Sequence, residues 1–145
     1  MADRYTFEIR LHSRPTAATA GPPLSMDAGS LPTLAVPADR QADTMAVSFD
    51  TALEKLATLP GCYTEPDGAI LWTGTDAQGR WQIDGNLYDR GGRVVFAALA
   101  GSCPVAALDQ LLGCFGWPHE PLMMELVREA VFVSQEVFRG HAARP

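Results

Sequence analysis

The stretch "RVVFAALAGSCPVAALDQLL", residues 93–112, decides the fold predicted for this chain. Its first eight residues are almost all apolar, which is typical of a strand covered on both faces. Gly101, Ser102 and Cys103 then end the run, and an amphipathic pattern typical of a helix begins at Pro104. The stretch therefore predicts a buried strand that turns at Gly101 into a helix, with Ser102 or Cys103 as the helix N-cap.

The residues before this stretch predict a helix followed by a meander of strands. Phe49, Leu53 and Leu56 recur at helical spacing behind Ser48, a plausible N-cap, so a helix is predicted over 48–61. Short alternating segments separated by glycine-containing turns then indicate hairpin strands. The predicted strands are residues 62–65, 69–75, 80–89 and 93–100.

The residues after this stretch predict two helices. One spans 104–116, and the other spans 121–140 as a single long helix, because Pro121 suits a first helical position and no glycine or proline follows before Gly140. Strands in sequence followed by helices indicate segregated layers. The predicted fold class is α+β, with an antiparallel meander sheet of three to five strands and helices packed on one face, two of them C-terminal.

The N-terminal third divides into a strand and a patternless segment. Tyr5, Phe7, Ile9 and Leu11 alternate with polar residues, which predicts a half-buried strand over 4–13. Five prolines then break every periodicity, which indicates a loop or a partly disordered linker. The predicted organisation is an N-terminal strand or arm (1–13), a Pro/Ala-rich loop or linker (14–44), an α+β core domain (45–140) and a C-terminal tail (141–145).

The composition indicates one acidic, globular domain. The chain has 145 residues, 47% of them hydrophobic, and a net charge of −6. Binding to nucleic acid or to anionic membranes requires clustered lysine and arginine, so the charge balance argues against both partners. Three cysteines without a C-x-x-C pair favour reduced thiols and a cytoplasmic protein. No secretory signal and no apolar run of transmembrane length is visible.

Cys103 is the first candidate for chemistry, because it stands where the predicted strand meets the predicted helix. A helix N-terminus lowers the pKa of a thiol placed there. A thiol enzyme also needs a base, and His119, in the constrained loop "GWPHEP" (116–121), is the histidine best placed to serve. The opposing interpretation is a packed cysteine, because no arginine follows at C-x5-R spacing and Asp109 adds negative charge. The residues favour the packed cysteine.

Motifs for cofactors and metals are missing from the sequence. It contains no GxGxxG, GxxxxGK[ST], H-E-x-x-H or paired C-x-x-C pattern, so neither a cofactor nor a metal is predicted. The candidate binding residues are aromatic and arginine side chains, which contribute most to interface energies. They are Trp117 in its loop, Tyr88 and Arg80 on the polar face of 80–89, and Arg90 in the turn that follows.

These observations predict a non-catalytic protein-interaction or adaptor module. Its partner is another protein or a second copy of the chain, for example a homodimer that exchanges residues 4–12 by strand addition. One alternative is a small thiol-dependent enzyme or redox sensor that uses Cys103. A second alternative is a small-ligand-binding domain whose pocket, between the sheet and the C-terminal helices, is lined by Met123, Met124 and Phe96.

Overall fold

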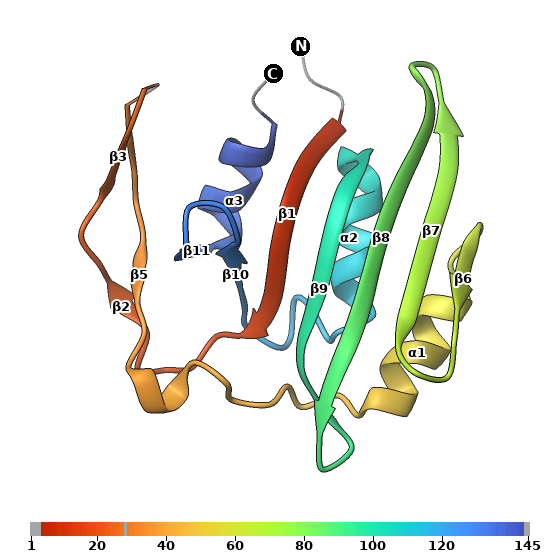
Figure 1. Ribbon diagram of the computed structural model, residues 1–145, viewed down its shortest axis with the longest axis horizontal. Coiled ribbons are helices and arrows are strands. Elements are labelled where there is room, and N and C mark those ends of the chain that lie inside the picture. Colours follow the sequence, from red (N-terminus) through yellow and green to blue (C-terminus); the bar gives the residue numbers. More distant parts are fainter. Residues whose placement is uncertain (1–3, 28, 144–145) are drawn as a thin grey trace.

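The computed structural model describes residues 4–27 and 29–143, in which a large antiparallel sheet carries three α-helices (Figure 1). The antiparallel α+β architecture with two C-terminal helices is confirmed, but the sheet has nine strands in this part of the chain instead of three to five. In spatial order these are β2 (Thr19–Ala20), β5 (Leu34–Ala35), β11 (Val131–Ser134), β10 (Leu122–Leu126), β1 (Arg4–Ser13), β9 (Arg93–Pro104), β8 (Gly79–Arg90), β7 (Ala69–Asp76) and β6 (Cys62–Thr64).

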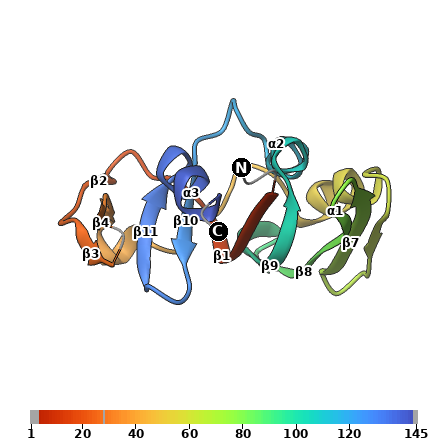
Figure 2. The ribbon, with the colours of Figure 1, turned by 90° about the horizontal axis from the view of Figure 1, so that it is seen from above.

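The helices cover one face of the sheet and leave the other without a helix (Figure 2). They are α1 (Phe49–Ala57), α2 (Val105–Gly113) and α3 (Gln135–Ala142). Because side chains alternate along a strand, Tyr5 and Phe7 of β1 point to the helices, where their rings contact Phe138 of α3. The main apolar core lies in this layer. We call the opposite surface of the sheet the open face.

Local sequence signals place α1 and the hairpin strands as predicted. The Ser48 hydroxyl accepts a hydrogen bond from the Thr51 N–H at 3.1 Å, so Ser48 is the N-cap of α1. The predicted strands at 4–13, 62–65, 69–75 and 80–89 correspond to β1, β6, β7 and β8. In Figure 1, β7, β8 and β9 form the predicted meander.

The stretch that contains Gly101 is straighter than predicted. The strand β9 does not turn at Gly101 but continues to Pro104, which is itself the N-cap of α2 and makes no side-chain cap hydrogen bond. The predicted cap by Ser102 or Cys103 is therefore wrong. The physical reason is that β1 extends to Arg4 and pairs with β9 as far as Pro104, so the ladder stabilises the extended backbone beyond the apolar run.

The predicted long helix over 121–140 is wrong. This segment forms the hairpin β10–β11 followed by α3. Leu122, Met123 and Met124 are all buried, because both faces of β10 are covered, and such a run imitates the wide apolar face of a helix. Ala130 adopts a φ of 59° in the hairpin turn, where its N–H donates to the Leu126 carbonyl at 2.8 Å.

The N-terminal segments lie against the rest of the chain. β1 pairs with β9 on one side and with β10 on the other, so it is a central strand of the sheet. Residues 14–44 contain β2, β5, the short 3-10 helix η1 (Ala38–Arg40) and a separate hairpin of β3 (Leu24–Met26) and β4 (Gly29–Leu31). The predicted tail over 141–145 begins inside α3, and residues 1–3 and 144–145 lie outside the described residues.

Candidate functional site

The open face carries a cluster of stacked side chains around Phe96. The ring of Tyr88, on β8, stacks on Phe96 with centroids 4.6 Å apart and planes at 27°. From β1, the Arg10 guanidinium carbon lies 5.2 Å from the Phe96 centroid, and the His12 ring centroid lies at 5.6 Å. We call Arg10, His12, Tyr88 and Phe96 the Phe96 cluster. The β8–β9 hairpin and the distant strand β1 therefore hold one aromatic and cationic surface.

A groove lies beside the Phe96 cluster and runs across β1, β9 and β8. It has a volume of about 290 Å³. Ala98 and Ala100 of β9 form its floor, and Glu8 from β1 and Asp84 from β8 are on opposite sides. Neither carboxylate forms an ion pair with another described residue. Small residues on the central strand thus leave a depression with an apolar floor and a carboxylate on each side, and Arg10 is also part of its lining.

His12 is the most buried polar residue of the cluster. It is 5% exposed, its Nε2 lies 3.0 Å from Glu125 Oε1, and its Nδ1 has no hydrogen-bond partner among the described residues. Burial lowers the pKa of His12 below its ordinary value, and the hydrogen bond to Glu125 opposes this effect. Phe132 of β11 packs edge-on against the imidazole at 5.4 Å. The folded protein therefore favours neutral His12.

Acid is expected to destabilise the protein in part through His12. Because the folded-state pKa lies below the ordinary value of 6.5, the unfolded chain binds a proton first as the pH falls below about 6.5. The free energy of unfolding then decreases between about pH 7 and pH 5. His12→Gln is expected to show a shallower decrease in urea titrations across this range. If the free energy of unfolding decreases equally steeply with falling pH in both proteins, His12 does not contribute to the acid destabilisation.

Cys103 is a packed residue in the helix-facing layer. It is fully buried on β9 opposite Tyr5, and burial raises its pKa to about 12. His119 lies in the exposed loop before β10, and β10 starts opposite Ser13 at the other end of β1. At about 3.3 Å per residue, the two ends of β1 are roughly 30 Å apart. The structure therefore does not bring Cys103 and His119 together, and the thiol alternative gains no support.

Thiol labelling tests this placement. At about pH 8, Cys103 in the folded protein is expected to react with iodoacetamide at least about a thousand-fold more slowly than an unperturbed thiol, because little thiolate forms. Cys114, whose pKa burial raises to about 11, is also expected to be protected, whereas the half-buried Cys62 reacts faster. Mass spectrometry before and after denaturation measures each site. Rapid native labelling of Cys103 would restore the thiol enzyme as a candidate.

The other predicted binding residues are dispersed. Tyr88 lies in the Phe96 cluster and is 46% exposed. Arg80 is exposed near the far end of β8, and its Nη2 lies 3.5 Å from Gln82 Oε1. Arg90 donates to the Ala42 carbonyl at 2.8 Å and so holds the segment before α1. Trp117 is half-buried against the core, in the loop that also contains His119.

The predicted pocket lined by Met123, Met124 and Phe96 has no counterpart in the sheet. Met123 and Met124 are neighbours on β10, so their side chains point to opposite faces, and both are fully buried. Phe96 pairs with His12 and lies on the open face. These three side chains therefore do not line one cavity between the sheet and the helices.

Sequence reasoning missed the contribution of β1 to the site. The alternation of 4–13 identifies Glu8, Arg10 and His12 as one polar face, but not the strands beside them.

Comparison with protein-family models, with curated proteins and with solved structures finds no match to this chain. In the described part of the chain, no helix has the length and apolar character needed to cross a membrane.

Proposed function

We propose that this protein is a non-catalytic protein-binding module whose open face contacts a partner protein. The observation that carries the proposal is the stack of Arg10, Phe96 and Tyr88 beside the groove on β9. Arginine and tyrosine are enriched among the residues that contribute most to binding energy. The exposed Tyr88, stacked on the half-buried Phe96, suits such a contact, because the stacking reduces the side-chain entropy lost on binding.

The groove favours a lysine or arginine side chain of the partner. Its floor of Ala98 and Ala100 accepts an aliphatic stem, while Glu8 and Asp84 on its two sides attract a cationic head group. The Arg10 guanidinium lies over Phe96, so it neutralises neither carboxylate through an ion pair. The net charge of −6 also attracts a cationic partner at longer range.

Affinity purification from the native host with matched variants tests this proposal. A protein retained by the wild type is purified and its Kd is measured against each variant. Tyr88→Ala is expected to weaken binding about 10- to 30-fold, because it removes an exposed stacking contact. Glu8→Gln with Asp84→Asn is expected to weaken it and to reduce its dependence on salt concentration.

Tyr63→Ala is the matched control. Tyr63 is 62% exposed on the edge strand β6. It also lies on the open face, but three strands away from Phe96 and outside both the Phe96 cluster and the groove. This variant is expected to bind the partner like the wild type. A Kd that is unchanged in Tyr88→Ala, or equally weakened in Tyr63→Ala, would contradict binding through the Phe96 cluster. Light scattering identifies the case in which the retained partner is a second copy of this chain.

A further inference from the structure

The backbone edge of β1 is unpaired at the point where β10 separates from it. β1 pairs with β9 from Arg4 to His12, but its pairing with β10 covers only Ile9 to Ser13. The last contact along this edge is the hydrogen bond from the Val127 N–H to the Glu8 carbonyl, at 3.2 Å. Beyond it the chain turns away into the β10–β11 hairpin. A central strand of the sheet thus has an unpaired edge over its first residues.

The backbone of Thr6 points to this unpaired edge. Peptide groups of alternate residues in an antiparallel strand face the same neighbour. Glu8 and Arg14 both bond to the β10 side, through Val127 and Pro121, so even-numbered residues of β1 face that side. Thr6 therefore directs its N–H and C=O away from β9. Neither group has a hydrogen bond to another described residue at this edge.

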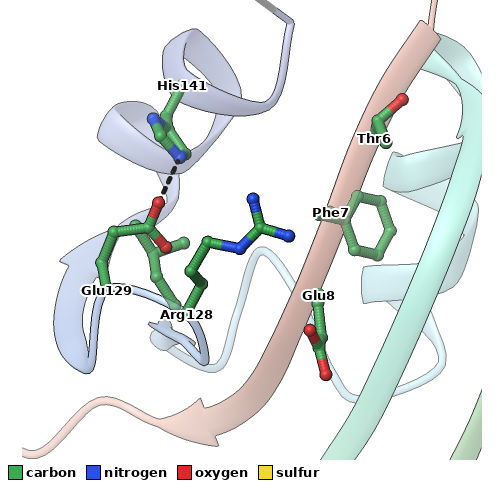
Figure 3. Close-up of a pocket in the computed structure, with 7 residues that line it drawn as sticks. Thr6, Phe7, Glu8, Arg128, Glu129 and His141 are labelled. Atoms are coloured by element: carbon green, nitrogen blue, oxygen red, sulfur yellow. Dashed lines mark ion pairs between the residues drawn. The ribbon is translucent and has the colours of Figure 1, made fainter. Parts of the chain in front are cut away.

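A cavity of about 260 Å³ adjoins this edge. Figure 3 shows Arg128 extending from the hairpin turn toward β1, with Glu129 and His141 paired behind it at 3.4 Å. Arg128 is exposed and forms no hydrogen bond or ion pair with another described residue. The cavity thus combines an unpaired strand backbone with an unpaired guanidinium group, and each of these attracts a specific kind of ligand.

We infer that this cavity binds a short extended segment of another protein, which adds a strand to β1 and carries a carboxylate for Arg128. Strand addition supplies the partners that the Thr6 N–H and C=O lack. A carboxylate matches the guanidinium through charge-assisted hydrogen bonds. This site uses the backbone edge of β1 and Arg128, and not the Phe96 cluster. It shares with the open-face groove the residue Glu8, which lines both cavities.

Nuclear magnetic resonance with peptide libraries tests the inference. The first probe is a library of acetylated, amidated pentapeptides with glutamate at the centre and random residues elsewhere, and the second has glutamine at the centre. In the free protein the Thr6 amide is expected to exchange with solvent faster than the Phe7 amide, which faces β9. The glutamate library, at about millimolar concentration, is expected to slow Thr6 exchange by about 10-fold or more.

Four variants assign the contacts. Arg128→Gln is expected to remove the advantage of the glutamate library over the glutamine library. Thr6→Pro deletes the outward N–H, a change that edge strands tolerate. Because this variant has no amide proton at residue 6, its binding is followed by chemical-shift changes of the neighbouring Phe7 amide, and these are expected to be absent with both libraries. Thr6→Val, which keeps the N–H, is expected to respond like the wild type. Tyr88→Ala is expected to respond like the wild type as well, which separates this site from the Phe96 cluster.

Three results would overturn the inference. The first is no change in exchange at the Thr6 amide of the folded wild type with either library. The second is an equal change with acetate alone at the same carboxylate concentration, because this would indicate a simple anion site without strand pairing. The third is retained binding in Thr6→Pro. If Thr6→Pro fails to fold, the wild-type exchange measurement and Arg128→Gln still decide.

Discussion

Replacing Gly101 with alanine is expected to destabilise the protein by about 3 kcal/mol or more. Gly101 has a φ of +134°, which side-chain-bearing residues rarely adopt, and an added Cβ would lie 2.1 Å from the Gln82 carbonyl oxygen. That oxygen belongs to the backbone of β8, so it cannot move without disturbing the β8–β9 ladder. Urea unfolding followed by tryptophan fluorescence measures the loss.

Gly79→Ala is the matched control for Gly101→Ala. Gly79 also has a positive φ, +111°, but an added Cβ there would meet nothing within 4 Å. Its replacement therefore measures the backbone strain alone, about 1 to 2 kcal/mol. The difference between the two variants isolates the collision with β8. Equal losses would show that β8 and β9 are not packed as closely at Gly101 as the structure has them.

Replacing Phe138 with alanine is expected to cost about 3 to 5 kcal/mol, which is the usual range for a fully buried phenylalanine. Phe138 is 0% exposed, and its ring packs edge-on against Phe7 at 5.4 Å and tilted against Tyr5 at 6.2 Å. It thereby fixes α3 on the first half of β1, where β10 gives no support. Thermal and urea unfolding measure the effect.

Phe132→Ala is the control for Phe138→Ala. Phe132 is half-buried on the open face, where it contacts His12, so the same substitution removes less buried area and is expected to cost clearly less. Phe138→Leu is expected to retain most of the stability, because the leucine side chain fills much of the volume. A small loss in Phe138→Ala would contradict the placement of α3 against β1.

Local patterns predicted the elements whose two faces differ. In β1 and β8 one face is apolar and the other is polar, so the alternation appears in the sequence itself. The Ser48 cap of α1 is equally local, because the donor and acceptor are three residues apart. The pattern failed at β10, where both faces are covered and Met123 and Met124 are equally buried. Without a polar face, its period of two cannot be distinguished from a helical stripe.

The candidate site was predictable only in part. Tyr88 was identified as an aromatic side chain on a polar strand face, and the alternation of β1 placed Arg10 and His12 on another. Neither pattern indicates that Phe96 lies between them, because the pairing of β1 with β9 joins residues that are far apart in the sequence, such as His12 and Phe96. For the same reason, the sequence did not show that Cys103 and His119, which are close in the sequence, lie near opposite ends of β1.

The sequence by itself determined the α+β class, the meander from β6 to β9, the Ser48 cap of α1 and the turns between the strands of the meander. These follow from backbone geometry and hydrogen bonds within a few residues. Only the tertiary structure decided that β1 is central, that 121–140 is a hairpin and a short helix, and that Arg10, Phe96 and Tyr88 form one surface. These features depend on which strand pairs with which, and that choice is made by burial over the whole chain.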